Sequence, residues 1–141
     1  MNDAEKNAQK RRLRPLIKKW RSALGLHHWD IDHDFYEGAI PDSNGDAAFT
    51  DALATTTSRW QYLTAVIRWR IDLMAETKDD ELERAVVHEY CHVLVNEMRT
   101  MREDGREGRM ADAYDTQHEE RVCSELTQAF LWTYQAGGEA Q

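Results

Sequence analysis

Two histidines four positions apart, with a glutamate directly after the first, are the residues in this sequence best suited to chemistry. His88 and His92 share one face of any helix that carries them, because one turn takes 3.6 residues. Zinc favours nitrogen ligands about 2 Å away in a tetrahedral shell, so two such imidazoles can bind one ion. Glu89 lies roughly 100° around the helix from His88, where it can accept a proton from a water molecule at the ion. The HExxH pattern therefore predicts a zinc site with an adjacent base.

The residues around this motif are apolar and predict a buried helix. A random chain of this length contains HExxH only about one time in a hundred. Two histidines and a glutamate on a buried helix are costly unless a partner satisfies them, and a metal ion does so. The alternative is a pair of hydrogen-bonded core histidines. Cys91, on the same helix, is predicted to pack in the core beside the site rather than to bind the ion. The flanking apolar residues are Val86, Val87, Val93, Leu94 and Val95.

A third ligand has to come from another element, and a helix predicted over about 116–135 carries four candidates. Glu125 points away from the apolar side of that helix and is expected to be solvated. Glu119 and Glu120 both border the apolar side, so the helical pattern does not choose between them. His118 remains an alternative and would make a three-histidine site.

Over about residues 60–135 the chain resembles a minimal gluzincin of the kind found in phages and bacteria, and it is more distantly similar to the ImmA/IrrE family. The specific part of the resemblance is HExxH. Such proteins take their third ligand from a glutamate on a following helix, with a small residue three places on and apolar residues further along. Glu120 matches this pattern, so the resemblance implies that it is the third ligand. The residues that complete the match are Cys123, Leu126-Thr127 and Phe130-Leu131.

The chain also departs from the ImmA pattern. Ser124 stands where that family has an asparagine, and no Met-Pro follows the final apolar pair. The antirepressor and DNA-damage roles of such proteins are therefore not carried over to this chain.

Several other residues are candidates for contact with a substrate. Tyr114 and His118 precede the third ligand and are predicted as substrate or oxyanion contacts, with a structural or solvent-facing role as the alternative. Trp60, Tyr62 and Trp69 flank or form the strand before the metal helix. That strand resembles the edge strand along which zincins align an extended substrate. The alternative is that these aromatic residues fill the core, which is favoured for Trp69.

Periodicity and turn residues predict an α+β domain: a small twisted β-sheet packed against the metal-binding helix, an N-terminal helix, and a C-terminal helix that supplies the third ligand. Thr77 is expected to cap the metal helix. We expect residues 1–10 to be a flexible N-terminus, 11–136 a single metallopeptidase-like domain, and 137–141 a flexible tail. Helices are predicted over about 12–24, 78–99 and 116–135, strands over 29–36, within 47–57 and over about 63–73, and a loop over about 102–115.

Composition limits the classes of function. A net charge of −8 argues against a general nucleic-acid surface. The segment 10–21 is nevertheless basic, and is either a solvated helix face or a docking surface for an acidic partner. Neither cysteine belongs to a CxxC pair, and the sequence shows neither a signal peptide nor a membrane span. The cytoplasm of a bacterium or of a phage-infected cell fits this pattern best.

Together these features predict a zinc-dependent hydrolase that cleaves amide bonds in a protein or peptide substrate, with Glu89 as the general base. The alternative is a non-catalytic module in which zinc only stabilises the fold, for example a phage factor that binds a host protein. A monomer is plausible. The sequence does not identify the substrate or the biological process.

Overall fold

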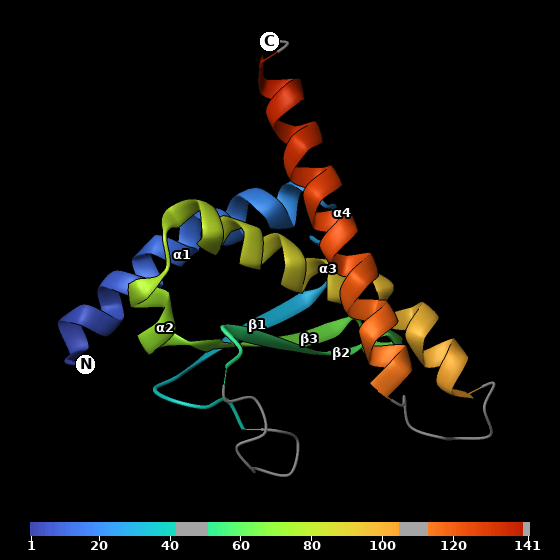
Figure 1. Ribbon diagram of the computed structural model, residues 1–141, viewed down its shortest axis with the longest axis horizontal. Coiled ribbons are helices and arrows are strands. Elements are labelled where there is room, and N and C mark those ends of the chain that lie inside the picture. The colour runs from blue at the N-terminus through green and yellow to red at the C-terminus, as the bar shows by residue number, and fades with distance from the viewer. Residues whose placement is uncertain (42–50, 105–112, 140–141) are drawn as a thin grey trace.

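The structure is a computed structural model in which the backbone is described for residues 1–41, 51–104 and 113–139, and side chains for 1–41, 51–98 and 117–137. It confirms the α+β class: four helices are combined with a three-stranded sheet (Figure 1). The elements in chain order are α1 (Asp3–Ala23), β1 (Asp30–Tyr36), β2 (Ala54–Arg59), a 3₁₀ turn (Trp60–Tyr62), β3 (Thr64–Arg70), α2 (Ile71–Glu76), α3 (Asp79–Asp104) and α4 (Ala113–Glu139).

The sheet has the order β1-β3-β2, with β1 parallel and β2 antiparallel to the central strand β3. Along β3 buried and partly exposed side chains alternate, because successive residues of a strand point to opposite faces. Ala65, Ile67 and Trp69 form the buried face. The expectation that the strand before the HExxH helix is an edge strand is therefore wrong, because β3 is central and the edge strands are β1 and β2.

The helices lie on one side of the sheet, and α3 packs against β2, α1 and α4 (Figure 1). One apolar cluster joins the buried face of β3 to the inner faces of α1 and α3. This cluster makes α3 a buried helix, as its apolar sequence predicts. The largest fully buried side chains include Trp20, Trp69, Tyr90, Leu13, Leu82, Val86 and Val87.

Helix α1 begins at Asp3, earlier than the predicted start near Arg12. Asn2 and Glu5 form a capping box: the Asn2 side chain accepts from the Glu5 backbone N–H at 2.9 Å, and the Glu5 carboxylate accepts from the Asn2 backbone N–H at 2.9 Å. These bonds satisfy backbone donors that have no partner inside the helix.

The predicted third strand extended too far, because the chain enters the short helix α2 at Ile71. Thr77 also differs from expectation. Its hydroxyl donates to the Leu73 carbonyl at 2.6 Å, so it closes α2 instead of capping α3.

Arg12 of α1 donates to the carbonyls of Met74 and Thr77 at 2.8 and 2.7 Å. A basic residue of α1 thereby holds the chain just before α3.

The basic residues of α1 thus have two different surroundings. Lys19 pairs with Glu83 of α3 at 2.6 Å, and Arg21 donates to the Trp29 carbonyl at 2.5 Å. The side chains of Arg11, Arg14 and Lys18 are exposed, in agreement with a solvated helix face. No described helix is long and apolar enough to cross a membrane.

The two long C-terminal helices exceed their predicted lengths. Helix α3 continues to Asp104, and α4 runs from Ala113 through Gly137 to Glu139. Most of the predicted loop, residues 105–112, lies outside the described residues, as do residues 140–141. The division into a flexible N-terminus, one domain and a flexible tail stays a prediction.

His33 gives the fold a predictable response to pH. It lies in β1, where its Nδ1 accepts from the Trp69 indole N–H at 3.0 Å. Burial lowers its pKa to about 4. The native state therefore resists protonation while the unfolded chain takes up a proton near pH 6.5, so stability falls as pH drops from about 6.5 to 4, by about 3 kcal/mol at most.

This loss can be measured by urea unfolding of the wild type and of His33→Asn, which keeps an acceptor near Trp69 but does not titrate. We expect the difference in unfolding free energy between the two proteins to change in favour of the variant between pH 6.5 and 4. A difference that stays constant over this range would contradict the assignment.

Candidate metal centre

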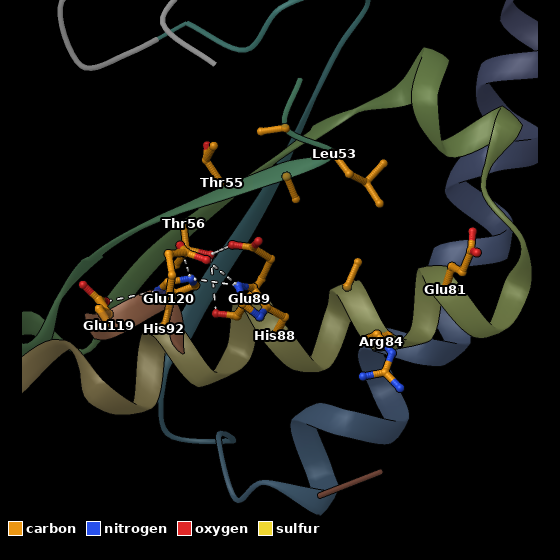
Figure 2. A pocket seen from close by; sticks show the side chains of 13 residues that line it. Leu53, Thr55, Thr56, Glu81, Arg84, His88, Glu89, His92, Glu119 and Glu120 are labelled. Atoms are coloured by element: carbon orange, nitrogen blue, oxygen red, sulfur yellow. Dashed lines mark hydrogen bonds and ion pairs between the residues drawn. The ribbon is translucent and has the colours of Figure 1, made fainter. Parts of the chain in front are cut away.

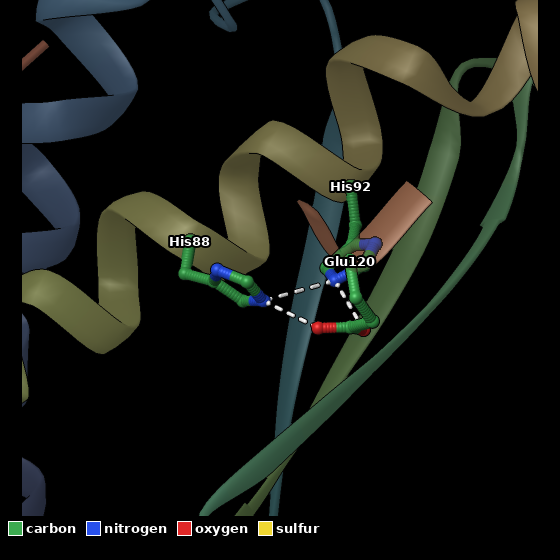
Figure 3. Close-up of side chains that lie close together, drawn as sticks. All are labelled: His88, His92 and Glu120. Carbon is green, nitrogen blue, oxygen red and sulfur yellow. Dashed lines mark hydrogen bonds and ion pairs between the residues drawn. The ribbon is translucent and has the colours of Figure 1, made fainter. Parts of the chain in front are cut away.

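Helix α3 presents the two histidines of the motif to the same point. The Nε2 atoms of His88 and His92 are 3.2 Å apart, and the ring planes are inclined at 77° (Figure 3). The four-residue spacing places both rings on one face of the helix, as predicted. Both are only partly exposed, so the nitrogen atoms meet at the edge of the core and not in open solvent.

Glu120 of α4 completes the group. Its Oε2 lies 3.0 Å from His88 Nε2 and its Oε1 lies 3.0 Å from His92 Nε2 (Figure 3). In a tetrahedral shell with metal–ligand bonds of about 2.0 Å, neighbouring ligand atoms are about 3.3 Å apart. The observed separations are close to this value, and two imidazoles with one carboxylate are ligands that zinc commonly takes. The donor set therefore fits a zinc ion.

The pKa values of these three side chains depend strongly on one another. The contacts with His88 and His92 lower the pKa of Glu120 well below its usual value. Burial alone would lower the pKa of His92, but its contacts with Cys123, Glu119 and Glu120 raise it to about 12. The two Nε2 atoms are close enough to share one hydrogen-bonded proton. A divalent ion at this point would replace that proton and take both nitrogens as ligands.

Glu119, which the helical pattern could not separate from Glu120, lies on the other side of His92. Its Oε1 is 3.1 Å from His92 Nδ1, and its side chain is 12% exposed against 54% for Glu120. A proton on Nδ1 that is donated to Glu119 leaves the Nε2 lone pair free for a metal. The two adjacent glutamates thus contact different nitrogens of one ring: Glu120 faces the ion position and Glu119 orients the imidazole.

Glu89 is buried, with 7% of its surface exposed, yet it is outside the three-residue group. Its Oε2 accepts a hydrogen bond from the Thr56 hydroxyl of β2 at 2.5 Å. Burial raises the pKa of the Glu89 carboxyl, while the Thr56 bond and the nearby histidines act in the opposite direction. A carboxyl with a raised pKa is better suited to accept a proton than an exposed one.

A cavity of about 760 Å³ opens beside these residues, between α3, β2 and α4 (Figure 2). The lining includes the three metal-binding candidates as well as Glu89 and Glu119. Volumes of this size are typical of small-molecule and peptide sites. The β2 side of the cavity is formed by Ala52, Leu53, Ala54, Thr55 and Thr56. The N-terminal turns of α3 add Glu81, Arg84 and Ala85.

Two predicted substrate contacts are not among the described residues that line this cavity. His118 is partly buried on α4 and lies outside the three-residue group. Tyr114 belongs to the first turn of α4, but its side chain lies outside the described residues. Both roles stay predictions.

Other residues are placed as the sequence indicated. Cys91 is fully buried against Thr127, and burial raises the pKa of its thiol to about 11, as expected for a core residue. Glu125 is exposed and pairs with Arg121 at 3.1 Å. Sequence reasoning missed Thr56, because nothing in the sequence of β2 shows that its hydroxyl reaches α3.

Comparisons with protein-family models, with curated proteins and with solved structures find no match for this chain. The interpretation of the site therefore rests on its residues and their geometry. From the geometry alone, the structure supports a candidate metal-binding group formed by His88, His92 and Glu120.

The different contacts of the two glutamates predict different losses of metal affinity. We expect the purified wild type to hold about one zinc per chain. Glu119→Ala removes the group that orients His92 and should weaken zinc binding about 10- to 100-fold. Glu120→Ala removes a ligand and should weaken it more than that. Competition with a chromophoric chelator measures all three affinities.

His118→Ala serves as the control and should keep the affinity of the wild type. Loss of zinc from His118→Ala, with Glu120→Ala still loaded, would show that the third ligand is a histidine.

Proposed function

We propose that this protein is a zinc-dependent hydrolase that cleaves amide bonds in peptides or proteins, as the resemblance to gluzincins implies. One observation carries the proposal: the buried carboxylate of Glu89 lies beside the three-residue metal group, at the wall of a cavity. A site with only a structural role has no use for a buried base at this position. Catalytic zinc sites characteristically have three protein ligands and one open position.

His88, His92 and Glu120 would hold the ion, and Glu119 would keep the His92 ring in the required orientation. When bound, zinc supplies a Lewis acid that polarises a carbonyl and lowers the pKa of a water ligand to about 7. The core residues of α3 bury the side of the group that faces the fold, while the side with Glu120 is open to solvent.

Glu89 acts as the general base in this proposal. Its Oε2 is held by Thr56, while Oε1 has no hydrogen bond to a described residue and is free to accept a proton from the attacking water. The same carboxyl then donates that proton to the amine that leaves. One residue thereby serves both steps, and no second acid is required.

The outer edge of β2 is suited to align an extended substrate. The Leu53 carbonyl accepts from the Arg70 N–H at 2.8 Å, so Leu53 directs its backbone groups towards β3. Because these groups alternate along a strand, Ala54 and Thr56 direct theirs to the opposite edge, which pairs with no other described strand. Both residues line the cavity. A peptide can therefore pair with this edge and pass in front of Glu89.

We place the activity in the cytoplasm of a bacterium or of a phage-infected cell, where the free thiols of Cys91 and Cys123 stay reduced. The alternative is a zinc-stabilised module that binds a host protein. The exposed cations Arg11, Arg14 and Lys18 lie at positions i, i+3 and i+7 of α1 and offer such a module a surface for an acidic partner.

Glu89→Gln distinguishes the enzyme from the module. This substitution keeps the size of the side chain and an acceptor for Thr56 but removes the base. We expect unchanged folding and zinc content and a fall in peptide hydrolysis of at least about a hundredfold. A peptide library analysed by mass spectrometry supplies the substrate, and the initial rate on the best peptide is the measurement.

The matched control is Glu125→Gln, which makes the same chemical change on an exposed helix face. It should hydrolyse the peptide at the wild-type rate. Equal rates for Glu89→Gln and wild type would exclude the proposed mechanism. Absence of cleavage by zinc-loaded wild type would favour the binding module.

A further inference from the structure

We propose that Thr56 is a positioning residue of the reaction, which ties the base to the strand residue that aligns the substrate. The inference rests on the proposed function and extends it, because it assigns a role to a residue outside the metal motif. It concerns a single hydrogen bond between the edge strand β2 and helix α3.

The hydroxyl of Thr56 is directed at the general base. Thr56 Oγ1 lies 2.5 Å from Glu89 Oε2 and 3.4 Å from the Glu89 backbone carbonyl, so its hydrogen is directed mainly to the carboxylate. Figure 2 shows the two side chains meeting between β2 and α3, next to the metal group. Thr56 lies 33 positions before Glu89, so this contact depends on the packing of the sheet against the helix.

Glu89 needs such a contact because its carboxylate would otherwise be free to rotate. Thr56 is the hydrogen-bond partner of this carboxylate among the described residues. The bond engages Oε2 of a residue that lines the cavity, so Oε1 remains available to a water molecule. A displacement of a reacting group by about 1 Å can reduce a rate about a hundredfold, so fixing the carboxylate has a large effect on turnover.

The backbone of Thr56 adds a second function at the same residue. Its N–H and C=O face the open edge of β2, by the alternation that starts from the Leu53–Arg70 hydrogen bond. A peptide paired at this edge is held by the backbone of Thr56, while the side chain of Thr56 holds the base. Any shift of β2 relative to α3 would then move substrate and base together, so their relative position is preserved.

The experiment compares zinc-loaded wild type with Thr56→Val and Thr56→Ser. Valine keeps the β-branched shape and the backbone but removes the hydroxyl, whereas serine retains the hydroxyl. We expect Thr56→Val to lower kcat about 10- to 100-fold with KM, zinc content and Tm unchanged. Thr56→Ser should restore most of kcat. Thr57→Val is the matched control, because Thr57 lies on the same strand, is exposed and is not among the residues that line the cavity.

A second measurement does not depend on hydrolysis. The infrared difference between wild type and Glu89→Gln isolates the carboxylate band of Glu89. We expect this band to shift in Thr56→Val and to stay in place in Thr57→Val, because only the former removes its hydrogen bond. The band shift tests the hydrogen bond between Thr56 and Glu89 even if no peptide is cleaved. Absence of cleavage would contradict the proposed function but not this hydrogen bond.

Three results would overturn the inference. The first is full activity of Thr56→Val, and the second is an unshifted band. The third is a loss of zinc or of Tm in Thr56→Val that parallels the loss of activity, because it would assign the hydroxyl to the fold and not to the base.

Discussion

The site depends on one constraint: two imidazole nitrogens and a carboxylate from separate helices converge on one point. His88 and His92 share α3, but Glu120 arrives from α4, and 27 residues separate it from His92 along the chain. The packing of α4 on α3 therefore determines whether the group exists. The buried base, the cavity and the edge strand are all arranged around this point.

The parts of the site that lie within one helix could be predicted from the sequence. The spacing of His88, Glu89 and His92 fixes their relative positions through helical geometry alone. Glu120 required the resemblance to gluzincins, because the helical pattern does not separate it from Glu119. The two are distinguished by the nitrogen of His92 that each contacts, which is a property of tertiary packing.

Prediction of the fold from the sequence has the same limit, because it too misses what depends on tertiary packing. The class and most elements follow from periodicity, but strand order does not, so β3 was expected at the edge and lies at the centre. Helix α2 was missed because Ile71 and Leu73 continue the apolar pattern of the strand. The start of α1 was misplaced although Asn2 and Glu5 form a recognisable cap, because apolar periodicity begins only at Leu13.

The uneven burial of α4 has a consequence for the order of folding. Among its described residues only Cys123 and Thr127 are fully buried, Leu126, Phe130 and Leu131 are partly buried against the core, and Trp132 is 69% exposed. Apolar packing therefore holds one side of α4, and coordination through Glu120 would add to its stability. Amide hydrogen exchange in α4 should then be fast in the metal-free chain and slow once zinc is bound. A bound ion would then stabilise the packing of the last helix on a core that is already folded.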